Sequence, residues 1–582
     1  MKQRLMSKFA SSGLIAGLVV GLSSGRADAC GGFFCSQQQP VNQAAERIIF
    51  ADHGDGTVTA VIQIMYEGPA ESFSWLLPIS TVPEGDDLKV ASDLAFTRLQ
   101  LATNPTFNLT TTVEGRCGSA FANDNALAGP VSVQRESCED NPYLVGCEAP
   151  EGGANLEASG IVGAFEWSVI SVPAGQADPS VPALAWLNAN GYDATPESAA
   201  LIGPYLAEGM YLLALRLTKG ADTGSIRPIQ LTYAAEAPMI PIKLTAVAAN
   251  DDMGVMTWTL SSSRAVPFNY NALELNEARV NWFNASSNYD GVVTEAADAA
   301  GGQGFVTEFA GPSSSLAEVV WRADEEAAWL SIETRTYFNF QDIFNTVFES
   351  YQSWNGFWDA IRRAVVLPEG LSFENFRICP NCYSDDITFS PASLLDAIET
   401  DVIEPVRGVQ ALIDAAAYTT RLYSTLSAAE MLVDPVFKFN PDLPDVDNIH
   451  QATRVIECNE NVQEFEASWR IDFPQGSTIR GTAQDVGQWP DAVAEQPANF
   501  RVLTLSTSGD GVVLEDNESE INGLLSAYNA TVPSPGAQSG GLCALSAPPG
   551  ERPSSSWLST GLWGVFGLAW LRRRRSSAAR PV

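Results

Sequence analysis

The first part of the chain alternates apolar and polar residues over short runs, and this period of two predicts β-strands. Residues 47–52 and 57–66 flank His53-Gly54-Asp55-Gly56, a turn composition that predicts a β-hairpin. The same criteria predict further strands at 72–77, 107–114, 161–172, 209–218, 226–233, 239–248, 253–260 and 276–284, and helices at 91–102, 180–190 and 196–207.

Helical periodicity replaces this pattern after about residue 312. Large apolar side chains recur at helical spacing in one stretch: Phe340, Phe344, Val347, Phe348 and Tyr351. Residues 391–417 form a second helical stretch, and strand patterns return at 467–473 and 501–507. We therefore expect a disulfide-stabilised α+β fold. It has a β-rich N-terminal half, a helical segment that packs on it, and late strands that can rejoin the sheet.

These patterns divide the chain into five segments. They are a signal peptide at 1–29, a β-rich part at 30–311, a helical segment with late strands at 312–530, a Pro/Gly/Ser spacer at 531–556, and a short apolar helix with an Arg-rich tail at 557–582.

The N-terminus has the three parts of an export signal. Lys2, Arg4 and Lys8 precede an apolar stretch at 14–22, and Ala27-Asp28-Ala29 supplies small residues for a signal peptidase. Cleavage there would leave Cys30 as the first residue. A lipoprotein signal is the alternative. Ordinary cleavage is favoured because Ser23-Ser24-Gly25-Arg26 separates the apolar stretch from the cysteine.

The C-terminus predicts attachment to a membrane. Residues 557–571 are apolar but would reach only roughly 22 Å as a helix, against about 30 Å for a hydrocarbon core. Arg572-Arg573-Arg574-Arg575 follow and would remain cytoplasmic. With Cys543 upstream, this tail resembles the C-terminal sorting signals of myxobacterial surface proteins. That resemblance implies Cys543 as a candidate site of lipid attachment, and a plain C-terminal anchor is the alternative. We expect a location at the cell surface, in the outer membrane or in the periplasm.

The charge of the chain limits the classes of partner that it can bind. It has 33 basic and 69 acidic residues, a net charge of −36, and basic residues are concentrated at the two ends. An acidic body repels phosphate backbones, so we expect no nucleic-acid partner. It suits cationic partners or divalent metal ions.

The nine cysteines fit an oxidising compartment. With Cys543 set aside, eight remain as disulfide candidates: Cys30, Cys35, Cys117, Cys138, Cys147, Cys379, Cys382 and Cys458. Short-range pairing favours Cys30–Cys35, Cys379–Cys382 and one bridge among Cys117, Cys138 and Cys147. The cysteine left over from that trio could then pair with Cys458.

Few residues offer recognisable catalytic chemistry. The chain has only two histidines, His53 and His450, so a histidine-based triad or multi-histidine metal site would have to use one of them. The C-x-x-C at Cys379 and Cys382 indicates either a thiol–disulfide oxidoreductase or a structural disulfide. Asp385 and Asp386 and the poor helix start after Cys382 favour the structural role. Zinc held by these cysteines with His450 and Cys458 is a further alternative.

Two carboxylate-based hypotheses remain. Asp442, Asp445 and Asp447, near Asp434, lie on a proline-rich stretch whose oxygens could bind calcium, or they are solvated turn residues. Paired carboxylates of a hydrolase are also compatible with so acidic a chain, but no pair stands out. We expect no cofactor other than this candidate calcium.

Several separated motifs resemble one bacterial family. They are Cys30-Gly31-Gly32-Phe33-Phe34-Cys35, Pro40-Val41-Asn42-Gln43-Ala44, Glu46-Arg47-Ile48-Ile49-Phe50, Ser74-Trp75-Leu76-Leu77-Pro78, Thr420-Arg421-Leu422-Tyr423-Ser424-Thr425-Leu426-Ser427 and Asp434-Pro435-Val436-Phe437. The chain resembles the secreted family called domain of unknown function 2330 over residues 30 to about 450. This resemblance implies export and brings no activity with it.

The sequence as a whole favours a surface-attached binding or structural component of the cell envelope over an enzyme. Its ligand or protein partner is not specified by any motif. The alternatives are a secreted hydrolase using paired carboxylates and a thiol–disulfide oxidoreductase.

Overall fold

The computed structural model describes residues 42–67, 74–117, 154–192, 194, 196–218, 226–246, 249–482, 489–490 and 493–532. The predicted signal peptide, most of the spacer, the C-terminal tail and five of the cysteines (Cys30, Cys35, Cys138, Cys147 and Cys543) lie outside these residues. Among the described residues, no helix has the length and hydropathy needed to cross a membrane.

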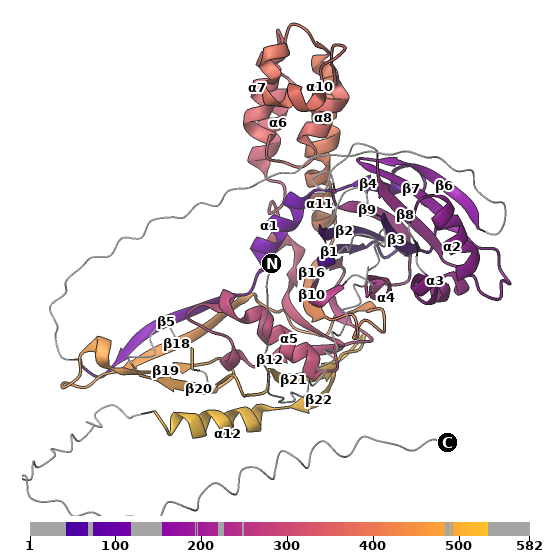
Figure 1. Cartoon of the computed structure of the whole chain (residues 1–582). Coiled ribbons are helices and arrows are strands. Elements are labelled where there is room, and N and C mark those ends of the chain that lie inside the picture. The colour runs from indigo at the N-terminus through magenta and orange to yellow at the C-terminus, as the bar shows by residue number, and fades with distance from the viewer. Residues whose placement is uncertain are drawn as a thin grey trace, which may run out of the picture. The chain divides into compact units, whose positions relative to one another are not determined.

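A ten-stranded mixed sheet organises the described residues (Figure 1). Its strands, in spatial order, are β22 (Val512–Asp516), β21 (Asn499–Thr504), β12 (Asn271–Leu275), β13 (Gly304–Pro312), β16 (Tyr418–Leu426), β10 (Ala249–Ser261), β1 (Asn42–Asp52), β2 (Thr57–Glu67), β9 (Ile229–Ala234) and β4 (Leu88–Val90). The predicted β1–β2 hairpin is confirmed, with Gly54 and Gly56 at positive φ in its turn. The late strands β21 and β22 do rejoin the sheet.

Two four-stranded sheets accompany the central one. The first contains β3 (Ser74–Ile79), β8 (Tyr211–Leu217), β7 (Phe165–Ser171) and β6 (Asn155–Val162). The helices α2 (Ser180–Ala189) and α3 (Pro196–Ala207) cover it and bury Leu187 and Ile202 against Leu212. The second contains β20 (Thr478–Gly481), β19 (Ser468–Asp472), β18 (Ile449–Glu457) and β5 (Thr106–Glu114). Two short pairs complete the β-structure: β11 (Arg264–Pro267) with β17 (Phe437–Asn440), and β14 (Val365–Val366) with β15 (Thr388–Phe389).

The predicted helical segment lies in the chain between β13 and β16, which are neighbours in the sheet. Its helices are α6 (Ala323–Glu333), α7 (Phe340–Tyr351), α8 (Phe357–Ala364), α9 (Phe373–Ile378), α10 (Pro391–Ile398) and α11 (Glu404–Ala415), with a π-helical turn at Glu399–Ile403. The aromatic residues at helical spacing pack inward, and Phe340, Phe344 and Phe357 are buried. Because β16 lies between β13 and β10, strands from both sides of residue 312 share one sheet.

The remaining helices are α1 (Asp93–Thr103), α4 (Ile242–Thr245), α5 (Tyr289–Ala299) and α12 (Glu518–Asn529). The strands predicted at 239–248 and 276–284 are wrong. In the first range α4 forms after Pro241, a residue without the N–H that a sheet requires. In the second, the Asn276 side chain accepts a hydrogen bond from the Ala278 amide and starts a 3₁₀ turn, because asparagine competes with strand hydrogen bonding in this way.

Two disulfides lie within the described residues. Cys379 and Cys382 are joined, as short-range pairing predicts, with their Cα atoms 5.3 Å apart. Cys117 is the member of its trio that pairs with Cys458, with 4.8 Å between Cα atoms. This bridge follows the parallel pairing of β5 with β18, where the Cys458 amide donates to the Glu114 carbonyl at 2.8 Å.

The two disulfides should differ in their contribution to stability. Cys117–Cys458 spans 341 residues of sequence and Cys379–Cys382 spans three. Because the entropy removed from the unfolded chain grows with loop length, we expect Cys117→Ser/Cys458→Ser to lower the free energy of unfolding by about 5 kcal/mol and Cys379→Ser/Cys382→Ser by about 2 kcal/mol. Urea denaturation of both double variants under non-reducing conditions measures this. Equal losses would contradict the loop-length argument.

Candidate functional site

Two opposite charges are buried in the middle of the central sheet. Arg421 Nε on β16 lies 2.6 Å from Glu308 Oε2 on β13, and the two side chains are 2% and 1% exposed. Removing both charges from water is costly, and their attraction offsets that cost only where further hydrogen bonds satisfy the remaining polar atoms.

Two helices supply those hydrogen bonds. The hydroxyl of Tyr289, at the start of α5, donates to Glu308 Oε1 at 2.8 Å. Arg421 Nη1 donates to the Gln100 carbonyl at 3.2 Å and to Thr103 Oγ1 at 3.1 Å. Both acceptors lie in the last turn of α1, where the helix dipole favours a cation. The ion pair therefore joins β13, β16, α1 and α5.

Glu308 reaches this position through a β-bulge. The register of β13 against β16 shifts between Thr307, which faces Leu422, and Phe309, which faces Arg421. A bulge adds one residue to a strand and so changes which side chains share a face. As a result Glu308 contacts Arg421, while the next residue, Phe309, packs against the helical core.

The pKa shifts of Glu308 and Tyr289 explain the role of Glu308. Burial raises the pKa of Glu308 above its ordinary value, while Arg421 and the Tyr289 hydroxyl act in the opposite direction. Burial, followed by the nearby Glu308 carboxylate, raises the pKa of Tyr289, so its hydroxyl remains a donor. One oxygen of Glu308 thus contacts a guanidinium and the other accepts from a hydroxyl. Glu308 is an anchor rather than a free acid or base.

A cavity of about 480 Å³ opens beside this pair, and we call it the Arg47 cavity. Strands β1, β2, β10, β13 and β16 contribute residues to it, as do α1, the α1–β5 connection and the start of α5. Its lining residues are Ala45, Glu46, Arg47, Met65, Gln100, Asn104, Pro105, Phe107, Gly254, Met256, Ala285, Ser286, Tyr289, Asp290, Glu308, Arg421 and Tyr423.

A second cavity, of about 740 Å³, shares Phe107, Tyr289 and Glu308 with the first, and we call it the His450 cavity. His450 Nδ1 lies 2.9 Å from Glu277 Oε1, and its ring stacks on Phe107 with 4.5 Å between centroids. Both cavities have the size of small-molecule sites in proteins.

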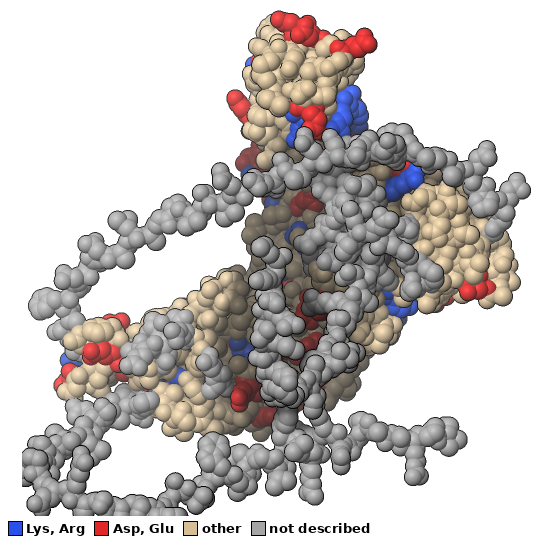
Figure 2. All heavy atoms as spheres, viewed as in Figure 1, with Lys and Arg blue, Asp and Glu red and all other residues tan. Residues whose placement is uncertain are grey.

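Figure 2 shows charged side chains of both signs distributed over the visible face of the molecule.

The structure does not assemble the predicted metal sites. Each candidate calcium ligand has a separate partner: Asp442 accepts from the Gly509 amide at 2.8 Å, Asp445 from the Tyr418 hydroxyl at 2.7 Å, and Asp447 from the Ile449 amide at 2.9 Å. These are local acceptors of turns and strand ends. Within the described ranges, no three His, Cys, Asp or Glu residues lie close enough to hold a metal ion. The proposed zinc ligands Cys379, Cys382 and Cys458 are all in disulfides.

The histidines have ordinary partners. His53 Nε2 lies 2.8 Å from Thr59 Oγ1 at the β1–β2 turn, which agrees with a turn residue. His450 is paired with Glu277 as described above, on the wall of the His450 cavity. The structure therefore brings one of the two histidines, and none of the three candidate calcium ligands, to the Arg47 or His450 cavity.

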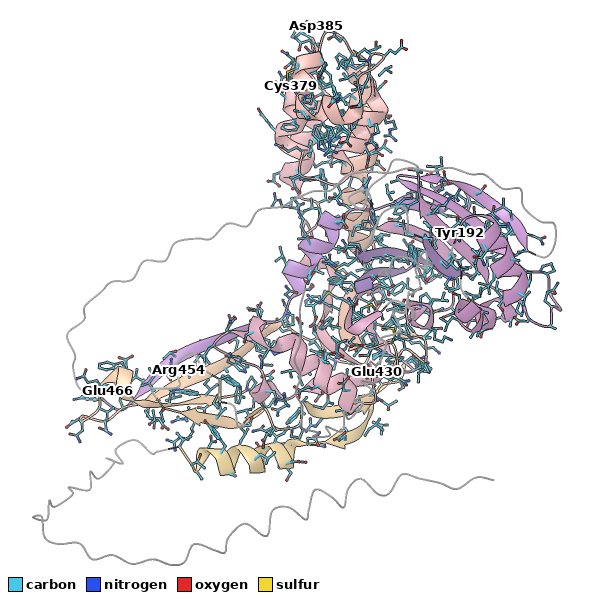
Figure 3. The ribbon with its side chains drawn as sticks, in the orientation of Figure 1. Tyr192, Cys379, Asp385, Glu430, Arg454 and Glu466 are labelled. Atoms are coloured by element: carbon cyan, nitrogen blue, oxygen red, sulfur yellow. A yellow bond between two sulfur atoms is a disulfide. The ribbon has the colours of Figure 1, made fainter. Side chains whose placement is uncertain are left out.

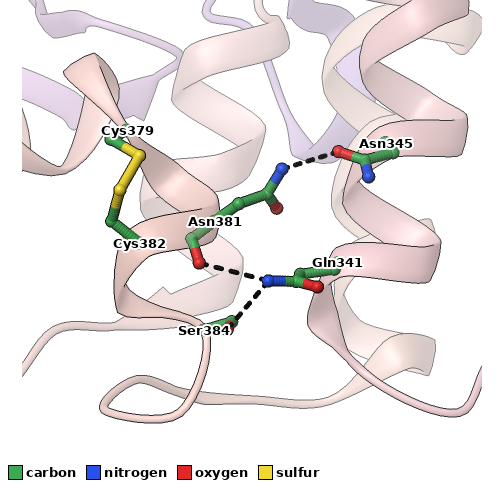
Figure 4. The surroundings of a disulfide bond; sticks show 6 residues. All are labelled: Gln341, Asn345, Cys379, Asn381, Cys382 and Ser384. Atoms are coloured by element: carbon green, nitrogen blue, oxygen red, sulfur yellow. Dashed lines mark hydrogen bonds between the residues drawn. A yellow bond between two sulfur atoms is a disulfide. The ribbon is translucent and has the colours of Figure 1, made fainter.

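The C-x-x-C disulfide is placed as a structural link (Figure 4). Cys379 follows the C-terminal end of α9, so the helix dipole would disfavour a thiolate there. The loop is fixed to α7, because Asn381 Nδ2 donates to Asn345 Oδ1 at 2.8 Å and Gln341 Nε2 donates to the Asn381 carbonyl at 3.3 Å. Figure 3 shows Asp385 near the same end of the helical segment, where its charge adds to the unfavourable field.

A comparison with known families matches residues 24–319, slightly more than half of the chain, to a family described as an uncharacterized protein conserved in bacteria, DUF2330. The chain belongs to this family. The match ends at residue 319, so it covers only part of the expected extent to about residue 450, and the motifs at 420–437 lie beyond it. No curated protein and no solved structure gives a match to the chain.

The sequence motifs did not mark Glu308 or Arg421 as site residues. Glu308 is the one charge in Gly304–Pro312, and Arg421 is the one charge in Tyr418–Leu426. A lone acid and a lone base in two otherwise uncharged strands are the signal that could have indicated a buried pair.

Breaking the ion pair should destabilise the protein strongly. We expect Glu308→Gln to lower the free energy of unfolding by about 3–5 kcal/mol, because it leaves the buried Arg421 without a counter-charge. Arg421→Met/Glu308→Leu should lose less than the sum of its two single variants. The four variants and the unaltered protein are compared by chemical denaturation. Arg335→Gln is the control, because the ion pair that Arg335 forms with Asp342 is partly exposed. A loss in Glu308→Gln no larger than that in the control would contradict this role.

Proposed function

We propose that this family member is an exported, surface-attached binding protein that holds a small polar ligand beside the Arg421–Glu308 pair. The observation that carries the proposal is the pair of cavities, of about 480 and 740 Å³, that meet at Phe107, Tyr289 and Glu308. Three residues that line them, Arg47, Arg264 and Glu277, each have a buried polar atom without a hydrogen-bond partner among the described residues. Such unsatisfied groups are costly unless a ligand or water meets them.

The expected location rests on separate observations. The export signal at 1–29, the Arg-rich tail and the two disulfides all support an oxidising, extracytoplasmic compartment. A binding protein at a surface needs a rigid scaffold, and the ion pair that joins the central sheet to α1 and α5 supports one.

The alternative functions find less support. A hydrolase needs two carboxylic acids that can reach a substrate. Glu274 and Glu308 line the His450 cavity and have pKa values raised by burial. However, both oxygens of Glu308 already contact protein groups. For an oxidoreductase, the position of Cys379 after α9 disfavours a reactive thiolate.

Export and attachment can be tested on the native protein. We expect unreduced peptide mapping of envelope fractions to show a first residue at Cys30, the Cys117–Cys458 and Cys379–Cys382 bridges, and a tail that ends near a lipid-modified Cys543. A protein found with free cysteines in the cytoplasmic fraction would overturn this part of the proposal. An intact, unmodified tail would replace lipid attachment by a plain anchor.

Ligand binding can be tested by filling the Arg47 cavity. Gly254 on β10 has no positive φ, and a side chain there would meet first the Tyr423 hydroxyl, 3.3 Å from an added Cβ. The hydroxyl has to move by a few tenths of an ångström, which the end of a side chain can do, so Gly254→Leu should fold and occupy the cavity. We expect native mass spectrometry of the protein from its own envelope to show a small-molecule adduct that Gly254→Leu lacks. Gly291→Leu, on α5 with open space around it, is the matched control. Equal adducts in all three, or none in any, would contradict a ligand in this cavity.

A further inference from the structure

Arg47 lines the Arg47 cavity, and its guanidinium is not fully hydrogen-bonded by the described residues. Its Nη1 donates to Gln100 Oε1 at 2.6 Å, and its guanidinium lies over the Phe96 ring with 5.8 Å to the centroid. Its Nε is buried and has no partner among the described residues, and within those residues Arg47 forms no ion pair. A guanidinium in this state is a ready binding group for a carboxylate, which can accept two parallel N–H bonds.

Asp290 presents an unpaired acid to the same cavity. It lies in the first turn of α5, and its Oδ1 accepts from the Tyr423 hydroxyl at a long 3.4 Å. Like Arg47, it forms no ion pair with any residue that the structure describes. Its place in the helix gives it a stabilising role through the helix dipole, but a neutral residue could meet that need at small cost.

Arg47 and Asp290, which carry opposite charges, lie on different sides of the part of the sheet that lines the cavity. Arg47 on β1 pairs with Met256 on β10, which in turn pairs with Tyr423 on β16. Two strand spacings, roughly 10 Å, therefore separate the backbones of Arg47 and Tyr423. The Tyr423 hydroxyl lies close to Gly254 and donates to Asp290. Because glycine has no side chain, the space beside Gly254 stays open.

We propose that the Arg47 cavity binds a small zwitterion of the amino-acid or short-peptide type, with its carboxylate on Arg47 and its ammonium group on Asp290. This inference rests on the proposed binding function and gives it a ligand class. Met65, Met256 and Phe107 line the same cavity and offer apolar contact to the carbon skeleton. Neither charge of such a ligand would be buried without an opposite partner, which is the condition for binding a charged group out of water.

The test uses matched ligands and matched variants. Isothermal titration of the full chain is made with free L-amino acids and dipeptides, with their N-acetyl derivatives, which lack the ammonium group, and with their amides, which lack the carboxylate. We expect both derivatives to bind about 10- to 100-fold more weakly than the free compounds, as loss of a charged hydrogen bond predicts. Arg47→Gln should remove the preference for the acid over the amide. Asp290→Asn should remove the preference for the free amine over the acetylated one.

The controls are Arg322→Gln and Asp324→Asn, an exposed pair on and beside α6 that lines neither cavity. They should bind like the unaltered protein. If amino acids bind but Arg47→Gln and Asp290→Asn leave both preferences unchanged, the inference is wrong. If another compound binds and only Gly254→Leu abolishes its binding, the ligand class is wrong while the proposed function stands. If no adduct and no binding are found at all, both are overturned.

Discussion

The buried ion pair between Arg421 and Glu308 is the interaction on which the rest of the structure depends. It couples two neighbouring strands of the central sheet and, through Thr103, Gln100 and Tyr289, fixes one end of α1 and one end of α5. An apolar pair of similar volume would hold the strands at lower desolvation cost. The charged pair adds directional hydrogen bonds, and these fix where the two helices stand. The Arg47 cavity lies between those helices, so the pair determines its walls.

This constraint also clarifies what the family match covers. Residues 24–319 include Glu308 but end before β16, which carries Arg421 and lies between β13 and β10 in the sheet. The matched segment by itself lacks both the middle strand and the counter-ion of Glu308. The helical segment between them enters and leaves at adjacent strands, β13 and β16, so it interrupts the sequence without interrupting the sheet. A folding unit of this chain therefore has to extend beyond the matched residues.

Local signals were readable from the sequence, and long-range pairings were not. The β1–β2 hairpin, α2, α3 and α7 follow from patterns within a few residues of each other, and the structure contains all four. The sheet order depends on contacts between residues more than a hundred positions apart, such as Val306 with Tyr423, which periodicity does not encode. The predicted strand at 239–248 failed because Pro241 overrides an apolar pattern. Glu308 was not singled out because its partner Arg421 lies on a strand far along the chain, and a bulge in β13 sets their contact.

The scarcity of positive charge gives the position of each interior arginine particular meaning. In this chain of net charge −36, a guanidinium buried near the centre of the sheet has to be stabilised by a partner. Arg421 has Glu308, and the buried Arg227 donates to the Ala91 carbonyl and lies in the field of Asp401, Asp359 and Asp93. Burial lowers the pKa of Arg47 while Asp93 raises it, and the neighbouring Arg421 lowers it further. Arg47 thus stands beside another cation without an ion pair of its own among the described residues, an arrangement that costs stability and that an incoming carboxylate would relieve.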